Sequence, residues 1–271
     1  MDAALTTKVV VLAAGRGTRM RAAGSTDISR EQASAADSGE KAMIPIGRPF
    51  LDYALSAYAD AGFTDACLIV GPGASATREY YERLVTRRLR VQFAVQARPI
   101  GVANAVLAAR DFVGDDSFVV VNGDNYYPTS VLAELRCAQA SALPAFSRDG
   151  LLREGQIAAE RIAAYALLEI DAEGLLRRIV EKPNLAETAA MAGAAVSMNC
   201  WLFDPRIFEA CERVPKSARG EFELPGAVQL GIDAMGMRFR TFPVDAGVLD
   251  LSNRGDIPKV ESRLRSVKVE L

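Results

Sequence analysis

A glycine-rich turn and two cations are the residues of this sequence best suited to bind and activate a substrate. The stretch VVVLAAGRGTRM runs from an apolar segment into Gly15, Gly17, Thr18 and Arg19. Glycines in such a turn expose backbone N–H groups that cradle anions, and an arginine offers two parallel N–H donors to a phosphate. A second cation, Lys41, follows a polar segment. Two cations beside such a turn favour a polyphosphate over a single phosphate, although the arginines would also suit a solvated surface.

The same turn argues against two common nucleotide-binding motifs. The dinucleotide fingerprint G-x-G-x-x-G needs a third glycine for close packing of helix on strand, but Met20 stands there. An acidic residue for the ribose is expected at the end of the second strand, where this chain has Gly71. The G-x-x-x-x-G-K-[ST] loop of ATP-binding proteins is also absent from the sequence. Both NAD and FAD are therefore disfavoured as ligands.

The absence of histidine restricts the chemistry further. The 271 residues include none, which excludes mechanisms with an imidazole base, such as Ser/His/Asp and Cys/His systems. The cysteines form no C-x-x-C pair and have no histidine with which to bind zinc. We therefore expect buried, reduced thiols at Cys67, Cys137, Cys200 and Cys211. Catalysis would rest on Asp, Glu, Lys, Arg, a metal ion or backbone groups.

Charge and hydropathy narrow the class of partner. The net charge is -2 and the pI about 5.5, with no basic block, so nucleic acid is not expected as a partner. No apolar run approaches the ~20 residues that span a bilayer. Residues 1–8 lack the charged-then-apolar order of a secretory signal. We predict a cytoplasmic protein that does not bind membranes.

Alternating strands and helices must position these residues. Apolar runs rich in β-branched residues predict buried strands, and apolar residues at helical spacing lie between them. The predicted strands are 8–12, 66–70, 91–95 and 118–121, and the predicted helices are 49–61, 75–88, 101–110 and 129–140. This order predicts an α/β fold with a Rossmann-like, mostly parallel sheet flanked by helices. Ligands of such sheets bind beyond the carboxyl ends of the strands, where the Gly15 turn and Asp124 fall.

The pattern changes after about residue 143. Strands joined by turns are predicted at 163–170, 175–180, 196–203, 238–244 and 247–251, and the segment 185–195 is consistent with helix or loop. The sequence has no internal repeat, so no β-helix domain is expected. The segment 21–40 is rich in Ala, Ser, Asp and Gly and lacks a hydrophobic face. It predicts a mobile loop with at most one helical turn, either a lid or a tolerated insertion.

Taken together, these motifs resemble those of the sugar-phosphate nucleotidyltransferases, also called nucleoside-diphosphate-sugar pyrophosphorylases. The family pattern L-x-x-G-x-G-T-R-[LM], K-x-x-x-P-[IV] and P-[ML]-[IL]-x-Y is matched by LAAGRGTRM, KAMIPIG and PFLDY. The stretches QARPIGVANA, NGDN, EKP, SMNCWLFD and VLDLS extend the resemblance over nearly the whole chain. It implies a single nucleotidyltransferase domain, residues 1–271, with a nucleotide-binding half at about 1–142 and a sugar-binding half at about 143–271.

The reaction implied by the resemblance converts an NTP and a sugar 1-phosphate to an NDP-sugar and pyrophosphate by in-line displacement at the α-phosphate. The attacking phosphate oxygen is already ionised at pH 7, which agrees with a chain that lacks histidine. Arg19 resembles the arginine that holds the β- and γ-phosphates, and Lys41 the lysine that bridges the phosphates near the reacting centre. Nucleotide contacts are implied for Leu12, Ala14, Gly15, Gly17 and Thr18.

Two carboxylates resemble the family's metal ligands. Asp124 follows the strand FVVVN. The second stretch reads [WL]-x-D-[TVI]-G-T in the family, and Asp250 is its aspartate here, with Ser252 and Asn253 where Gly and Thr are usual. Two carboxylates together with phosphate oxygens and water suit Mg²⁺. The resemblance therefore implies Mg²⁺ as the cofactor.

Further residues resemble those that select the substrates. Gln96 and Gly101 match the Q-x-x-x-x-G that sets a glutamine side chain and a glycine backbone against a pyrimidine edge. An amide both donates and accepts, which favours UTP or dTTP. Glu181 and Lys182 resemble the pair that contacts sugar hydroxyls and the sugar phosphate, and Asn199 stands where the family lines the sugar site.

Three other functions are compatible with parts of this sequence. A GT-A glycosyltransferase shares the fold, but NGDN lacks the second aspartate of its D-x-D motif. A non-catalytic regulatory paralogue that binds nucleotide sugars would tend to lose the cations or carboxylates, which all stand here. The residues of the nucleotide-binding half cannot distinguish a sugar nucleotidyltransferase from a cytidylyl- or uridylyltransferase that acts on a phospho-alcohol. The resemblance also leaves a homo-oligomer open, because members of the family are often dimeric or tetrameric.

Overall fold

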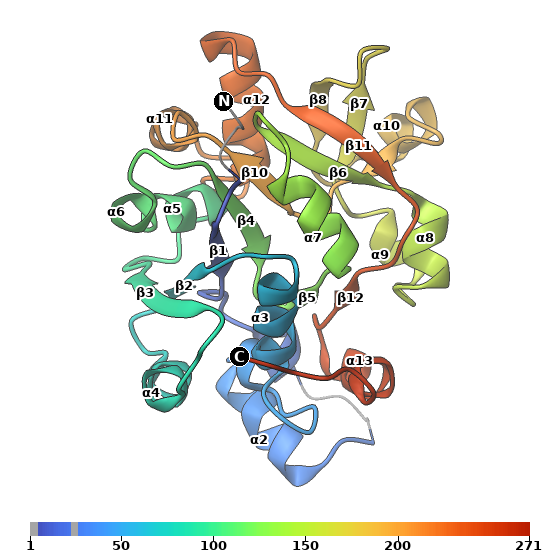
Figure 1. Ribbon diagram of the computed structural model, residues 1–271. Helices are drawn as coiled ribbons and strands as arrows, with labels where there is room; N and C mark the ends of the chain where they lie inside the picture. The colour runs from blue at the N-terminus through green and yellow to red at the C-terminus, as the bar shows by residue number, and fades with distance from the viewer. Residues whose placement is uncertain (1–4, 23–26) are drawn as a thin grey trace.

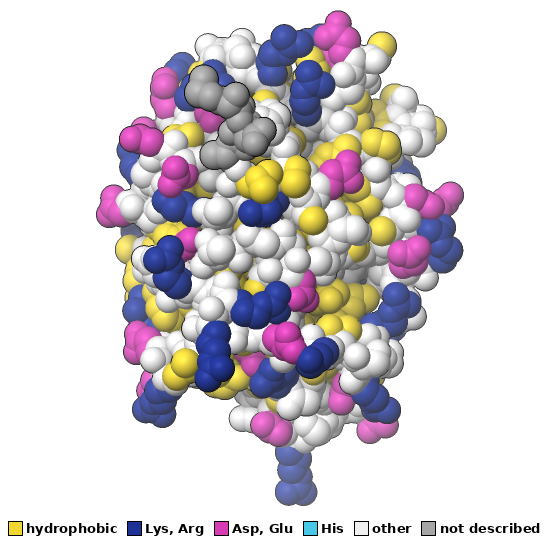
Figure 2. Space-filling model, viewed as in Figure 1, with side chains coloured by type: hydrophobic (Ala, Val, Ile, Leu, Met, Phe, Trp, Pro, Cys, Tyr) yellow, Lys and Arg dark blue, Asp and Glu magenta, His cyan; other side chains and the backbone are white. Residues whose placement is uncertain are grey.

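A computed structural model describes residues 5–22 and 27–271 and contains a mixed sheet between two layers of helices (Figure 1). On the face shown in Figure 2, lysine and arginine side chains are interspersed with aspartate and glutamate. Within the described ranges, no helix has both the length and the apolar character needed to cross a membrane.

Four strands form the parallel part of a ten-stranded sheet, in the spatial order β3-β2-β1-β4. Their bounds are β1 Lys8–Leu12, β2 Asp65–Val70, β3 Arg90–Val95 and β4 Phe118–Asn122. Val10 pairs with Cys67 on one side and with Val120 on the other, and all three are buried. These strands read as continuous apolar runs because helices cover both of their faces. The predicted α/β class is confirmed.

The helices form two layers because strand side chains alternate between the faces of the sheet. Val9 and Val11 pack with helices α3 (Phe50–Asp60) and α7 (Thr129–Arg136), which lie in front of the sheet in Figure 1. Val10 packs on the other face with α5 (Val102–Leu107), α11 (Ile207–Arg213) and α12 (Leu224–Met235). Full burial of one such valine stabilises the fold by roughly 1.5–3 kcal/mol.

The second half of the chain extends the sheet with short, mainly antiparallel strands. Beyond β4 the order continues β10-β6-β9-β7-β8, and β11 pairs with β6. Their bounds are β6 Ala142–Phe146, β7 Leu167–Ile170, β8 Leu176–Val180, β9 Ala195–Val196, β10 Trp201–Phe203 and β11 Arg240–Val244. Strand β6 was not predicted. The predicted strand 163–170 begins only at Leu167, because helix α9 (Ala159–Ile162) precedes it.

The predicted strand 196–203 is also wrong as one element. It is divided into β9 and β10 at Asn199, whose φ of 52° lies in the left-handed region. An asparagine tolerates this conformation better than most residues. The two strands consequently pair with different neighbours, β9 with β6 and β7, and β10 with β4 and β6.

The segment 21–40 corrects a second expectation. Residues 23–26 lie outside the described residues, but Arg30–Ser38 form helix α2 rather than a loop with one turn. The Ser29 side chain accepts from the Gln32 backbone N–H, and the Gln32 side chain accepts from the Ser29 backbone N–H, which makes a capping box. Gln32 Nε2 also donates to the Pro45 carbonyl at 3.0 Å and to Glu261 at 3.2 Å. Helix α2 is therefore packed against the fold.

Arg254 connects the last part of the described chain to the glycine-rich turn. Its Nε donates to the Met20 carbonyl at 2.9 Å, and its guanidinium pairs with Asp37 at the end of α2. A third apolar cluster surrounds this connection and includes Met20, Ala36 and Leu251. The turn is thus held by a residue 234 positions away in the sequence.

Helix α4 ends at Arg83, five residues before the predicted end at residue 88. It is one of the remaining elements, which are short or peripheral. Their bounds are α1 Thr18–Arg21, η1 Lys41–Met43, α4 Ser75–Arg83, α6 Arg110–Val113, β5 Asn125–Tyr126, α8 Arg148–Arg153, α10 Leu185–Ala190, β12 Leu249–Asp250, η2 Arg254–Asp256 and α13 Ile257–Leu264. Strands β5 and β12 pair with each other in a separate two-stranded sheet.

Candidate nucleotide-binding site

A cavity of about 630 Å³ lies beyond the carboxyl ends of β1 and β4. This is the edge at which parallel α/β sheets bind ligands. Its volume is within the range of small-molecule sites. The predicted site residues that line it are Leu12, Ala14, Gly15, Thr18, Lys41, Gln96, Gly101, Asp124 and Asn199. The predicted residues outside its lining are Gly17, Arg19, Glu181, Lys182 and Asp250.

The glycine-rich turn forms one wall of the cavity. Gly17 adopts a φ of 62° at the start of α1, and a Cβ on it would clash with the Gly39 backbone. Gly15 instead faces open space, because apart from its chain neighbours no atom of the described residues lies within 4 Å of the position that a Cβ on it would occupy. Gly17 is thus required by close packing, whereas Gly15 leaves room for a ligand. Arg19 is exposed on α1 and does not contribute to the cavity lining.

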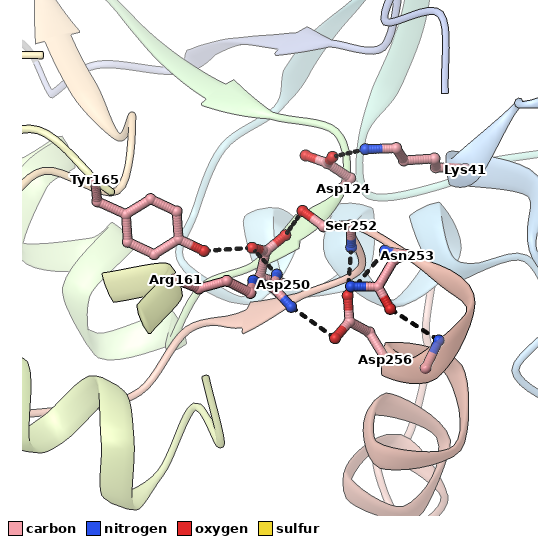
Figure 3. Close-up of polar contacts among 9 residues, drawn as sticks. Lys41, Asp124, Arg161, Tyr165, Asp250, Ser252, Asn253 and Asp256 are labelled. Carbon is pink, nitrogen blue, oxygen red and sulfur yellow. Dashed lines mark hydrogen bonds and ion pairs between the residues drawn. The ribbon is translucent and has the colours of Figure 1, made fainter. Parts of the chain in front are cut away.

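Lys41 and Asp124 form an ion pair at the cavity wall. Lys41 Nζ lies 2.6 Å from Asp124 Oδ2, and their side chains are 17% and 24% exposed (Figure 3). Lys41 begins η1, and Asp124 lies between β4 and β5. The Asp124 carbonyl also accepts from the Leu251 backbone N–H at 2.8 Å. The pair brings a cation and an anion, 83 residues apart in the chain, to the open end of the sheet.

Asp250 has a different environment from Asp124. Its carboxylate is 7% exposed. It forms an ion pair with Arg161 and accepts from the Tyr165 hydroxyl at 2.6 Å and from the Ser252 hydroxyl at 2.8 Å (Figure 3). Burial and the neighbouring Asp250 charge raise the pKa of Tyr165, so that hydroxyl remains a donor at neutral pH. Three donors therefore surround one carboxylate.

A second carboxylate completes this cluster. Arg161 Nη1 donates to Asp256 Oδ1 at 2.7 Å, and Asp256 Oδ2 accepts from the backbone N–H groups of Ser252 and Asn253 at 3.0 and 2.9 Å. Burial lowers the pKa of Arg161, but the charges of Asp250 and Asp256 outweigh this and raise it overall. Arg161 is therefore a permanent cation between two aspartates. Sequence reasoning missed Arg161, because no local pattern signals a partner 89 residues away.

The residues present fit the implied divalent ion only in part. Asp124 lines the cavity and offers carboxylate oxygens of the kind that Mg²⁺ prefers. Asp250 is outside the cavity lining and its oxygens already accept from three donors. Among residues 5–22 and 27–271, no group of three or more Asp, Glu, His or Cys side chains is arranged to hold a metal. The two-carboxylate site implied by the resemblance is not assembled in this structure.

Gln96 and Gly101 are brought together at another part of the cavity. Gln96 is buried at the end of β3, and its Nε2 donates to the Gly101 carbonyl at 2.9 Å and to Asn104 Oδ1 at 3.2 Å. No donor of the described residues reaches its Oε1 in the structure. Gly101 has a φ of 128°, and a Cβ there would clash with the Phe222 backbone. The amide is therefore held rigidly, with an acceptor oxygen left for a ligand.

The residues expected at the sugar are more dispersed. Asn199 lines the cavity from the break between β9 and β10. Glu181 and Lys182 follow β8 as exposed residues, and Lys182 has a φ of 49°. Glu221 also lines the cavity. Its neighbour Phe222 donates its backbone N–H to the Ile100 carbonyl at 2.9 Å, which locates Glu221 near the Gln96–Gly101 pair.

The cavity lies at the carboxyl edge of a parallel sheet, where α/β proteins bind ligands, and is lined by a glycine-rich turn, a lysine–aspartate pair and a rigid amide. It is therefore a candidate nucleotide-binding site. The chain belongs to the nucleotidyl transferase family, whose sequence profile matches residues 8–246.

The relatives are sugar-phosphate nucleotidyltransferases, which confirms the resemblance. The chain is 30% identical over 257 residues to a glucose-1-phosphate thymidylyltransferase of Streptomyces antibioticus, covering 93% of this chain and 65% of that protein. It is 27% identical over 259 residues to a UTP–glucose-1-phosphate uridylyltransferase of Haloferax volcanii, covering 95% and 96%. The chain spans 56% to 65% of the length of the first curated relatives that it matches.

The fold is also found among solved structures. A UDP-glucose pyrophosphorylase complexed with UDP-glucose has a TM-score of 0.74 at 18% sequence identity, covering 97% of this chain and 100% of that one. Similarity at this level of identity is evidence about the fold alone.

Proposed function

We propose that this protein is a nucleotidyltransferase that makes an NDP-sugar and pyrophosphate from an NTP and a sugar 1-phosphate. One observation carries the proposal: the glycine-rich turn, the Lys41–Asp124 pair and the Gln96–Gly101 pair all line one cavity. Each suits a different part of a nucleotide, namely the phosphates, the reacting centre and the base. The thymidylyl- and uridylyltransferases among the relatives support the same reaction class.

The proposed chemistry is an in-line displacement at the α-phosphorus. An ionised phosphate oxygen of the sugar 1-phosphate forms the new P–O bond, the bond to the β-phosphate breaks, and its electron pair leaves with pyrophosphate. No proton is transferred, so no histidine is needed. Lys41 would leave Asp124 for the phosphates and neutralise charge as the bond breaks, while the turn orients the nucleotide. Arg19 would hold the leaving pyrophosphate from the outer side of the turn.

Mg²⁺ is the proposed cofactor, held by Asp124 and the phosphates. When bound, it would shield the two polyanions from mutual repulsion.

The base is proposed to be uracil or thymine. Gln96 Nε2 already donates to Gly101 and Asn104, which leaves Oε1 to accept. The N3–H of uracil or thymine is a donor of the right kind for that oxygen. UTP or dTTP is therefore the proposed nucleotide.

The sugar 1-phosphate is proposed to bind at the Asn199 side of the cavity. Glu181 and Lys182 are proposed to contact the sugar hydroxyls and phosphate from the end of β8. Their exposure in the structure is compatible with contacts made at the cavity entrance.

A non-catalytic protein that binds nucleotide sugars is the second candidate. It is favoured by the Arg161–Asp250 ion pair, which occupies a carboxylate that the catalytic pattern uses.

Pyrophosphate release separates the two functions. We would assay it with Mg²⁺ across five NTPs and a panel of sugar 1-phosphates, and with phospho-alcohols as alternative acceptors. Release that requires UTP or dTTP and one sugar 1-phosphate, and that is lost in Lys41→Ala, is the expected result. No release from any pair, with a nucleotide still raising the melting temperature, would overturn the proposed enzyme in favour of the binding protein.

A further inference from the structure

We propose that the metal site of this protein uses one carboxylate, Asp124, and is filled only together with the nucleotide, while Asp250 anchors the fold and does not bind the ion. This inference rests on the proposed nucleotidyl transfer. It departs from the two-carboxylate site that the sequence resemblance implies. Three observations about Asp250, Asp124 and Lys41 carry it.

The first observation is that the oxygens of Asp250 are already occupied. A carboxylate offers about four lone-pair sites. The Asp250 oxygens accept from Tyr165, from Ser252 and from the charged Arg161. These donors take three of the sites, so a metal ion bound through both oxygens would have to displace at least one of them, from a side chain that is only 7% exposed. Breaking the Arg161–Asp250 ion pair in this way would leave Arg161 with Asp256 as its remaining carboxylate partner, and loss of one partner of a largely buried pair is unfavourable.

The sequence departure after Asp250 contributes directly to this arrangement. Ser252 stands where a glycine is usual, and its hydroxyl donates to Asp250 Oδ1 at 2.8 Å. Asn253 stands where a threonine is usual, and its side chain accepts from the Gly255 backbone N–H at 2.8 Å to begin η2. The same η2 includes Asp256, whose Oδ1 accepts a hydrogen bond from Nη1 of Arg161. The two unusual residues therefore build the cluster that encloses Asp250.

The second observation is that the two aspartates face different spaces. Asp124 lines the large cavity. Asp250 lines a separate hollow of about 10 Å³, together with Arg161, Asp256 and Lys259. That hollow has room for about one water molecule, and two cations line it. Asp250 and Asp124 are neighbours along the backbone pairing of β12 with β5, but each lines a different hollow.

The third observation concerns the order of binding. Lys41 Nζ lies 2.6 Å from Asp124 Oδ2 and supplies that carboxylate with a counter-charge. A free divalent ion would have to displace the lysine and would gain only one protein carboxylate. Nucleotide phosphates change this, because they offer new anions to Lys41 and additional oxygens to the ion. Mg²⁺ is commonly bound in this way, by one or two carboxylates and substrate phosphates.

Binding of Mn²⁺ tests this proposal without reference to turnover. The free-ion electron paramagnetic resonance signal would be followed with the protein alone and with a non-hydrolysable UTP analogue, after correction for binding to the analogue itself. We expect the analogue to tighten Mn²⁺ binding at least tenfold. Asp124→Asn should weaken binding in the complex at least tenfold. Asp250→Asn should change it less than twofold while lowering the melting temperature.

Two further variants sharpen the result. Lys41→Met should strengthen Mn²⁺ binding to the protein alone several-fold, because it frees Asp124. Arg161→Met should lower the melting temperature at least as much as Asp250→Asn, because it removes the ion pairs with both Asp250 and Asp256. The double variant should add little to Arg161→Met, because the pair with Asp250 is already lost. Equal weakening by Asp250→Asn and Asp124→Asn would overturn the proposal. So would a protein that binds Mn²⁺ as tightly alone as with the analogue, or not at all in either state.

Direct observation of the ion removes the dependence on variants that fail to fold. Anomalous scattering from Mn²⁺ in crystals of the wild-type complex should locate the ion within coordination distance of Asp124 and away from Asp250. An ion bonded to Asp250 would overturn the inference. Pyrophosphate release is measured separately. An ion on Asp124 alone in a protein without turnover would refute the proposed function while leaving this metal site intact.

Discussion

The parallel and antiparallel halves of the sheet contribute very differently to the cavity. Its lining comes from residues 12 to 124 with two exceptions, Asn199 and Glu221. In the parallel half, the carboxyl ends of neighbouring strands meet at one edge of the sheet, so the residues that follow these strands lie close together. In the antiparallel half, successive strand ends alternate between the two edges. Asn199 reaches the cavity from the break between β9 and β10, and Glu221 from the segment before α12.

This difference suggests that the nucleotide side is preformed and the sugar side is not. Gln96 is fixed by two hydrogen bonds and Lys41 by an ion pair. Glu181 and Lys182 remain exposed outside the lining. We therefore expect substitutions in the parallel half to affect turnover strongly, and substitutions in the antiparallel half to affect mainly the KM of the acceptor.

The largest effect is expected from Lys41→Ala. Loss of a cation aimed at developing phosphate charge should lower kcat/KM by about 10²–10³-fold, with a melting temperature close to that of the wild type because the pair is near the surface. Steady-state kinetics and thermal unfolding would measure both. Lys268→Ala, which removes an exposed ion pair with Glu270, is the matched control. A Lys41→Ala variant that unfolds would instead indicate a structural role.

The next largest effect is expected from Gly101→Ala, and it is a loss of stability. The φ of 128° and the clash of a Cβ with the Phe222 backbone oppose any side chain at this position, at a cost of about 1–3 kcal/mol. Urea unfolding would measure the change. Gly73→Ala is the control, because in the part of the chain that the structure describes no atom beyond its chain neighbours lies within 4 Å of its Cβ position. Equal stability of the two variants would show that the Gly101 turn is not rigid, and would weaken the view of a preformed nucleotide side.

Gln96→Glu tests how the base is selected. The carboxylate could no longer donate to Gly101 and Asn104, but it could accept from the two N–H groups of a guanine edge. We expect the ratio of kcat/KM for UTP over GTP to fall at least tenfold, which corresponds to about 1.4 kcal/mol. Gln92→Glu, at an exposed position of the same strand, should leave the ratio unchanged. A similar change in both variants would indicate an effect of charge alone.

The smallest effect is expected from Lys182→Ala. An exposed lysine at the end of β8 should raise the KM of the sugar 1-phosphate several-fold, because surface charges contribute up to about 1 kcal/mol. The KM of the NTP should stay within twofold. Initial-rate measurements with each substrate varied in turn would test this. A loss as large as that of Lys41→Ala would show that the two halves contribute equally and would overturn the comparison.

Sequence reasoning performed best where local pattern and tertiary structure agree. The four parallel strands are continuous apolar runs because they are buried on both faces, and Gly17, Gln96 and Gly101 occupy positions that only a few residue types can fill. Helix α2 was missed because it is polar, although Ser29 and Gln32 carry a capping-box spacing that could have revealed it.

Other features had no local signal. Strand β6 includes Pro144, and proline reads as a strand breaker because it cannot donate a ladder hydrogen bond. The break at Asn199 depends on which neighbours its two flanking strands find. The enclosure of Asp250 depends on Arg161, which contacts Asp250 but lies 89 residues away in the sequence. The sequence thus predicted most of the expected residues that line the cavity, but not Arg161, which sets the environment of Asp250.

The contact of Arg254 with Met20 has a consequence for the synthesis of this protein. The two residues are 234 positions apart, so the ribosome completes the glycine-rich turn long before its support exists. At about 5–20 residues per second, the delay is roughly 10 to 50 seconds. During that time the nascent chain would carry the turn without this support, and the contact with Met20 could form only after Arg254 has emerged.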